Sequence, residues 1–159
     1  RRAVTSGRQG LHSRTSLKAV LASLARSLDK VHRDRDITIA IAVDEGIVVP
    51  VDEQDAMELL GNLLDNACKA CDQDVRAYTC GNNDGRIALV IENDGRGLNA
   101  QQLADMMARG RRGDQYGEGQ GLGLAIVQDI ADSCDIELQF EPRTGGGSRV
   151  TLTFPPLRS

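Results

Sequence analysis

The sequence is poor in aromatic residues, with no tryptophan, two tyrosines and two phenylalanines in 159 residues. Single-stranded nucleic acids stack on aromatic side chains, so this scarcity argues against such a binding surface. An excess of basic charge is also missing, because the formal net charge at pH 7 is −4. No apolar run approaches the roughly 20 residues of a membrane-spanning helix, and no signal-peptide pattern is present. We therefore expect one domain with a hydrophobic core and no nucleic-acid partner.

Cysteine is also infrequent, with four residues in the chain. Cys68 and Cys71 have the C-x-x-C spacing of many redox and zinc sites. No second C-x-x-C and no histidine pair completes a zinc site, and both cysteines lie inside an apolar helical pattern. The pattern favours reduced thiols that act as small core residues, with a redox or metal role as the alternative.

The spacing of apolar residues predicts both helices and strands. Residues 17–35, and the stretch after Asp52 up to Cys71, have the period of amphipathic helices. A further helix is expected to open in the glycine-rich segment 119–123, and a shorter helical piece at 100–107. The stretches that read as strands are 37–43, 47–51, 75–80, 86–93, 136–140 and 150–154.

These elements predict an α/β sandwich, with about three helices on one face of a mixed, mostly antiparallel five-stranded sheet. The strand at 86–93 is apolar on both faces, which predicts a central place in that sheet. Residues 1–15 are expected to be a linker, 16–156 the domain and 157–159 a C-terminal tail.

The helix after Asp52 carries a polar stripe opposite its apolar side. Glu58, Asn62, Asp65, Asn66 and Lys69 recur at helical spacing along it. Asparagine is a poor helix former, so two of them four residues apart suggest a specific role. Their oxygens suit a hard cation such as Mg²⁺, and the lysine suits a phosphate. A merely solvated face is the alternative.

Two glycine segments frame a long polar loop at 109–119. The first, from Asn93 to Leu98, follows a buried strand and contains Gly95 and Gly97, which permit close approach of the backbone to a ligand. The second has glycines at 117, 119, 121 and 123, where free backbone N–H groups at a helix start can hold phosphate. A Rossmann site is not indicated because no strand directly precedes it, and no Gly-Lys-Ser/Thr of a Walker A loop occurs.

The order of these motifs resembles the ATP-binding catalytic domain of bacterial sensor histidine kinases. This domain has the Bergerat fold shared with gyrase, Hsp90 and MutL. The resemblance spans residues 16–156 and is strongest to the PhoQ-like branch, on Asp65-Asn-Ala-Cys-Lys69 and Gly119-Gln-Gly121.

The resemblance implies ATP and Mg²⁺ as ligands. It assigns the metal to Asn62, Asn66 and Gln120, and the phosphates to Lys69 and the loop arginines Arg111 and Arg112. The full set of nucleotide-binding residues that it implies is Asn62, Asn66, Lys69, Asn93, Asp94, Gly95, Gly97, Leu98, Arg111, Arg112, Tyr116, Gly119, Gln120, Gly121, Leu122 and Gly123. Gyrase-like relatives carry a water-activating glutamate at position 62. Asparagine cannot accept that proton, which favours phosphoryl transfer to protein over hydrolysis.

Three positions depart from the family pattern. Asn93 stands where the family has its adenine-reading aspartate, which predicts weaker discrimination of ATP over GTP. Ala70 replaces an aromatic residue next to the nucleotide, and Tyr116 is the candidate substitute. Gly117 replaces the second arginine of the loop, so that either Arg111 takes over its role or the phosphates have fewer contacts.

No catalytic residue is assigned, because neither histidine has the phosphoacceptor context of the family. His12 and His32 are both expected at the surface. The chain is thus expected to be a catalytic domain that binds Mg-ATP without phosphorylating itself. Alternatives are a regulatory nucleotide-binding module without transfer activity and an anti-sigma-type serine kinase of the same fold.

The implied partners are ATP or ADP, the phosphoacceptor-histidine domain of a longer parent kinase and, indirectly, a response regulator receiver domain. This fragment is expected to be monomeric and the parent homodimeric. The domain is expected on the cytoplasmic side of a parent anchored in the inner membrane.

Overall fold

The computed structural model describes residues 13–81, 85–95, 120–143 and 145–157, with the backbone alone for the first residues of the last helix, 120–123. In chain order the described elements are β1 Thr15–Ser16, α2 Leu17–Val31, β2 Thr38–Ala42, β3 Val48–Val49, α3 Glu53–Ala70, β4 Asp74–Cys80, β5 Ala88–Asn93, α5 Gln120–Ser133, β6 Glu137–Pro142 and β7 Ser148–Thr153.

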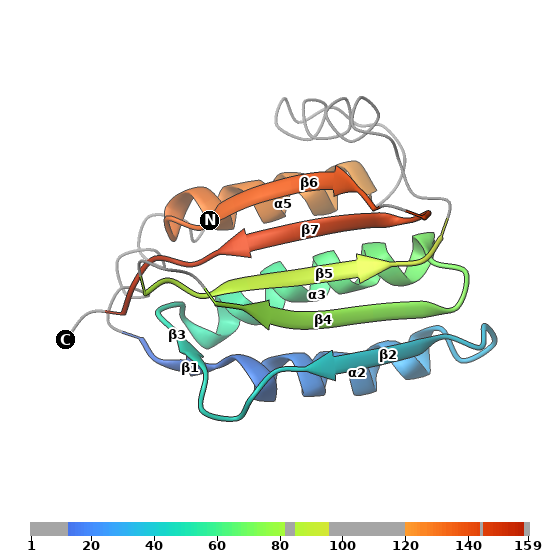
Figure 1. The fold of residues 1–159 in the computed structure, drawn as a ribbon, viewed down its shortest axis with the longest axis horizontal. Coiled ribbons are helices and arrows are strands. Elements are labelled where there is room, and N and C mark those ends of the chain that lie inside the picture. Colours follow the sequence, from blue (N-terminus) through green and yellow to red (C-terminus); the bar gives the residue numbers. More distant parts are fainter. Residues whose placement is uncertain (1–12, 82–84, 96–119, 144, 158–159) are drawn as a thin grey trace.

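The main sheet has five strands in the order β2-β4-β5-β7-β6 (Figure 1). Only β2 and β4 pair in parallel, and the other three pairings are antiparallel. β5 is the central strand, and all six of its residues are buried. The mixed sheet and its apolar central strand were both predicted from the sequence, and both are confirmed.

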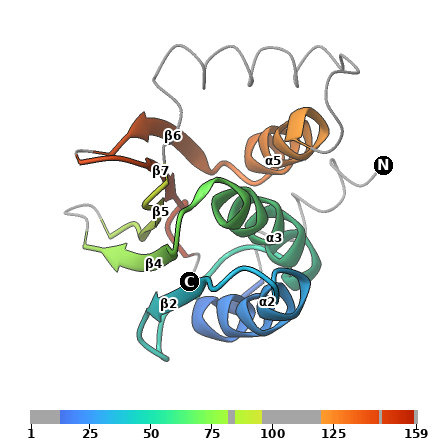
Figure 2. The same cartoon turned by 90° about the vertical axis from the view of Figure 1, so that its right-hand side faces the viewer.

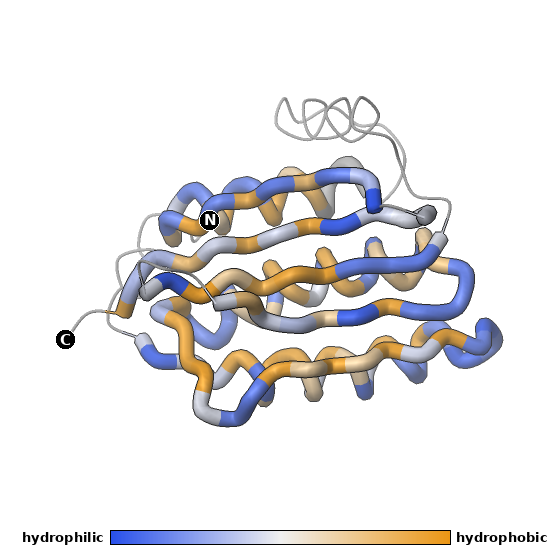
Figure 3. Tube along the Cα trace, viewed as in Figure 1, coloured by the Kyte–Doolittle hydropathy of each residue, from blue (hydrophilic) through white to orange (hydrophobic). Residues whose placement is uncertain are grey.

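Helices α2, α3 and α5 pack side by side on one face of the sheet (Figure 2). The hydrophobic core lies between the two layers, and α3 is the middle helix. Apolar and polar residues alternate along α3 (Figure 3), and its leucines at 59, 60, 63 and 64 are buried. Burial of the leucine side of α3 turns the opposite, polar side of the helix away from the core.

Both ends of α3 are capped. The Asp52 carboxylate accepts a hydrogen bond from the Gln54 N–H at 3.1 Å, and aspartate is a residue type that favours this capping position. At the other end, the Arg35 guanidinium donates to the carbonyl oxygens of Cys68 and Cys71, at 2.7 and 2.8 Å. A cation there satisfies carbonyls that have no partner within the helix and complements the helix dipole.

Several predicted boundaries differ from the structure. The strand predicted at 47–51 is only Val48–Val49, because Pro50 has no N–H for further pairing, and it pairs with β1 outside the main sheet. Thr15 was expected in the linker, but it lies in β1, pairs with Val49 of β3 and donates its hydroxyl to the Val51 carbonyl. A two-residue strand is too short to produce a periodic pattern. Helix α2 ends at Val31 instead of residue 35, because the following turn directs Arg35 toward α3. The helical piece predicted at 100–107 lies outside the described residues.

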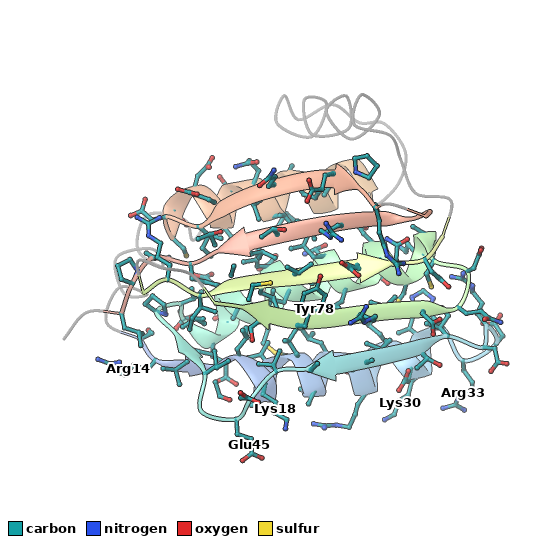
Figure 4. All side chains as sticks on the ribbon, viewed as in Figure 1. Arg14, Lys18, Lys30, Arg33, Glu45 and Tyr78 are labelled. Atoms are coloured by element: carbon teal, nitrogen blue, oxygen red, sulfur yellow. The ribbon has the colours of Figure 1, made fainter. Side chains whose placement is uncertain are left out.

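The other face of the sheet carries a row of charges across its strands. Glu92 of β5 is buried, accepts hydrogen bonds from the Tyr78 hydroxyl at 2.7 Å and the Arg149 Nε at 2.9 Å, and has Arg143 within 3.6 Å. Burial pushes the pKa of Glu92 upward, but these donors outweigh it and leave the pKa below its usual range. Figure 4 shows Tyr78 on this face, which no described helix covers. None of the helices within the described ranges is long and apolar enough to cross a membrane.

Candidate functional site

Three of the predicted site segments meet at one end of the sandwich. The last turn of α3, the end of β5 and the start of α5 lie together on the right of Figure 1, beside the β6–β7 turn. Gly95 lies against the backbone of Ala70 and Cys71, so closely that a Cβ at position 95 would overlap the Ala70 carbonyl oxygen. The glycine after β5 therefore lets the C-terminal end of α3 lie directly against the end of the central strand.

The polar side of α3, opposite its leucines, carries the two asparagines Asn62 and Asn66, and both are half-buried. The Asn62 Nδ2 donates to the carbonyl oxygen of Glu58 at 2.7 Å. This bond uses one N–H of the Asn62 amide and leaves the carboxamide oxygen available to a ligand. Carboxamide oxygen is a suitable ligand for a hard cation, so the residues present fit Mg²⁺.

Lys69 lies one helical turn beyond Asn66, and its ammonium group is 3.1 Å from Oδ2 of Asp65. The other carboxylate oxygen of Asp65 is 3.0 Å from Nε2 of His32. His32 was predicted to be a surface residue, and this prediction is wrong: only 12% of its side chain is exposed. The α2–β2 connection folds back onto α3 and brings the imidazole to Asp65, a contact between residues 33 positions apart.

Asn93 at the end of β5 is 4% exposed, and its carboxamide has partners on both atoms. Its Oδ1 accepts from the Gly95 N–H at 3.1 Å, and its Nδ2 donates to the Ser148 hydroxyl oxygen at 2.8 Å. One N–H of Nδ2 and one lone pair of Oδ1 remain beyond these bonds. The side chain can therefore both donate to and accept from a ligand.

Asp94 faces a different direction from Asn93. Its Oδ1 accepts from the N–H groups of Asp72, Gln73 and Asp74, at 3.0, 3.1 and 3.0 Å. Partial burial raises the pKa of Asp94, but these backbone donors outweigh it and hold the pKa below its usual range. The carboxylate thus joins the α3–β4 turn to the end of β5, which gives it a structural task in the site.

The β6–β7 turn supplies residues that the sequence did not point to. Ser148 bonds Asn93, and the Arg143 Nη1 donates to the Asn93 carbonyl oxygen at 3.2 Å. Gly147 has a φ of +99°, and a Cβ at this position would overlap that same carbonyl oxygen. Glycine at position 147, which has no side chain, therefore permits the turn to approach the end of β5 this closely.

Several predicted site residues cannot be placed. Helix α5 begins at Gln120, as the glycine-rich segment predicted. The side chains of residues 120–123 are not described, and the metal role of Gln120 stays a prediction. The predicted site residues that lie outside the described residues are Gly97, Leu98, Arg111, Arg112, Tyr116, Gly117 and Gly119.

The C-x-x-C pair has the properties of core thiols. Cys68 and Cys71 are buried and unpaired, and the Cys71 thiol donates to the Cys68 carbonyl oxygen at 3.3 Å. Burial raises the pKa of Cys68 to about 12 and also raises that of Cys71. A thiol that stays protonated is a poor nucleophile and a poor metal ligand. No cluster of metal-binding side chains of histidine, cysteine or acidic type occurs among the described residues.

Comparison with known proteins identifies the family. Residues 51–158 match the family model of histidine kinase-, DNA gyrase B- and HSP90-like ATPases. The sensor protein kinase CarS of Pseudomonas aeruginosa is 37% identical over 139 residues, which are 87% of this chain and 31% of CarS. The sensor protein PhoQ of Escherichia coli is 30% identical over 135 residues, or 85% of this chain and 28% of PhoQ. The chain thus spans about a third of the length of these curated relatives.

Solved structures agree with this assignment. The solved chain of the mycobacterial sensor histidine kinase MprB superposes with a TM-score of 0.73 at 26% identity, over 91% of this chain and 97% of the solved chain. The catalytic domain of histidine kinase ThkA has the same fold, with a TM-score of 0.77 at 18% identity over 90% and 94% of the two chains. The chain therefore belongs to the histidine kinase-, DNA gyrase B- and HSP90-like ATPase family, and its similar relatives there are sensor kinases of the PhoQ and CarS type.

Proposed function

We propose that this chain is the ATP-binding catalytic domain of a sensor histidine kinase. It binds ATP at the end of the sandwich where α3, β5 and α5 meet, and presents the γ-phosphoryl group to a histidine on another domain. The observation that carries the proposal is the orientation of Asn62. Its amide nitrogen bonds the Glu58 carbonyl, and its oxygen is left to the site, one helical turn from Asn66.

Mg²⁺ is the proposed metal, held by the oxygens of Asn62 and Asn66, with Gln120 as a third ligand. Bound there, it would neutralise charge on the phosphate oxygens. Lys69 supplies a second positive charge from the same face of α3. Arg111 and Arg112 in the loop are the proposed further phosphate contacts, and Tyr116 the proposed aromatic surface for the base.

Transfer to protein is favoured over hydrolysis by the chemistry of position 62. A water nucleophile needs a general base, and a carboxamide cannot take up a proton at neutral pH. The contribution of this domain is then to orient the phosphates and to balance their charge.

The proposal extends to the longer protein to which such a domain would belong. The curated relatives are about three times as long as the matched segment and are named sensor kinases. We propose a parent with an upstream phosphoacceptor-histidine domain, dimeric through that domain, membrane-anchored with this domain in the cytoplasm, and acting on a response regulator.

Labelled ATP tests the function. Incubation of this chain alone with γ-labelled ATP should leave no label on the protein. A longer protein with the upstream histidine domain should acquire alkali-stable, acid-labile phosphohistidine. Binding without label in the longer protein would identify a regulatory module instead. Acid-stable phosphoserine on a protein substrate would identify a serine kinase, and rapid phosphate release by the chain alone would identify a hydrolase.

A further inference from the structure

We propose that His32 is a positioning residue for Lys69 and acts through the carboxylate of Asp65. The inference rests on the proposed nucleotide site, in which Lys69 contacts the phosphates. It adds a residue from outside the motifs of that site, contributed by the end of α2 and brought to α3 by the fold.

The three side chains form a short chain of contacts with a graded exposure. Nε2 of His32 lies 3.0 Å from Oδ1 of Asp65, and Oδ2 of Asp65 lies 3.1 Å from Nζ of Lys69. The exposed fractions of the side chains rise from 12% for His32 to 31% for Asp65 and 45% for Lys69. A carboxylate accepts hydrogen bonds and does not donate them, so Nε2 carries the hydrogen. In this row of three side chains, the imidazole of His32 is thus the buried end and the ammonium group of Lys69 the exposed end.

The backbone around His32 is held on both sides. Its N–H donates to the Leu28 carbonyl at 2.9 Å and closes the last turn of α2, and its carbonyl accepts from the Arg35 N–H at 3.0 Å. The Arg35 side chain is in turn bonded to the end of α3. These contacts leave the imidazole little freedom to move relative to Asp65.

This arrangement has two effects on Lys69, and both favour phosphate binding. A lysine side chain has a flexible four-carbon stem, and fixing the Asp65 carboxylate restricts where its ammonium group lies before a ligand arrives. The hydrogen bond from His32 also satisfies part of the Asp65 charge, so the carboxylate competes less with a phosphate for Lys69. Loss of the imidazole should therefore weaken the phosphate contact by both routes.

Binding measurements on this chain with ligands that differ in their phosphates test the inference. In His32→Ala, the dissociation constant of a non-hydrolysable ATP analogue should rise about fivefold. This corresponds to about 1 kcal/mol, the typical net contribution of one hydrogen bond. The dissociation constant of adenosine, measured by displacement, should not change. Arg33→Ala is the matched control, because Arg33 is the next residue and points into solvent (Figure 4), and it should bind both ligands normally.

Further variants separate positioning from a general structural role. His32→Phe keeps the ring volume without an N–H donor and should behave like His32→Ala, whereas His32→Gln keeps a donor and should recover most of the affinity. In a Lys69→Met background, His32→Ala should have no further effect on the ATP analogue.

The inference would be overturned if His32→Ala and His32→Phe both weakened the binding of the analogue and of adenosine equally. It would also be overturned if His32→Ala had its full effect on analogue binding in the Lys69→Met background. Unchanged analogue affinity in His32→Phe would overturn it as well. Failure of the unsubstituted chain to bind the analogue at all would instead refute the proposed function, so the two failures are distinguishable.

Discussion

Replacement of Asn93 by aspartate should change which nucleotide base the site prefers. The present side chain donates one N–H to Ser148 and accepts from the Gly95 N–H, and it retains one donor and one acceptor position. An amide at this position can accept from the amino group of adenine and can donate to the carbonyl oxygen of guanine. We therefore expect the unsubstituted chain to discriminate weakly between ATP and GTP.

In Asn93→Asp both existing contacts can persist, because the Ser148 hydroxyl can rotate to donate and Gly95 continues to donate. The carboxylate then offers acceptors only. A charge-assisted bond to the adenine amino group adds about 1 kcal/mol. The loss of a donor to guanine, whose carbonyl oxygen then faces a carboxylate, costs at least about 1 kcal/mol more. Together, about 2 kcal/mol raises the ratio of ATP to GTP affinity about thirtyfold.

The assay is calorimetric titration with non-hydrolysable analogues of ATP and GTP in the presence of Mg²⁺. Because Asn93 is only 4% exposed, a carboxylate at this position should also lower the free energy of unfolding by about 1 to 2 kcal/mol, which thermal unfolding measures. Gln139→Glu is the control, since it adds the same charge at an exposed position of β6. An affinity ratio that stays unchanged in a folded Asn93→Asp variant would refute the assignment of Asn93 to the base.

Two further outcomes are expected from the described contacts. Asp94→Ala removes the acceptor of three backbone N–H groups, each partly exposed bond contributing about 1 kcal/mol or less. The free energy of unfolding should therefore fall by about 2 to 3 kcal/mol. Asp72→Ala, at an exposed neighbouring position, should leave the free energy of unfolding unchanged. The pKa of Asp94 is depressed in the folded protein, so the stabilisation by its carboxylate should be complete above pH about 4 and lost as the pH falls further. The free energies of unfolding of Asp94→Ala and Asp72→Ala should therefore converge in acid. Iodoacetamide at pH 8 should label Cys80, which is exposed. It should label Cys68 and Cys134 only on unfolding, because both are buried and burial raises their pKa values to about 12 and about 11. Labelling of Cys68 or Cys134 in the folded protein would contradict their place in the core.

The elements of the fold could be predicted because each has its own local pattern. The leucine side of α3 is a periodic signal and the apolar run of β5 a continuous one, and both elements lie where those signals placed them. Asp52 is a capping residue by type and position, and it caps α3 in the structure. These predictions needed no information from distant parts of the chain.

The contacts within the site could not be predicted in the same way. Ser148 meets Asn93 across 55 positions, and His32 meets Asp65 across 33. Which side chains meet at such separations depends on strand order and on how a connecting turn folds back, and neither leaves a periodic trace. The sequence therefore identified the polar face of α3 but not the imidazole that packs against it.

The metal-dependent nucleotide site is tested most directly by calorimetric titration of this chain with a non-hydrolysable ATP analogue, with and without Mg²⁺, compared with Asn66→Ala. We expect the unsubstituted chain to bind the analogue more tightly when Mg²⁺ is present, and Asn66→Ala to lose this difference while remaining folded. Equal binding by both proteins, independent of Mg²⁺, would contradict the assignment of α3 as the metal-binding wall.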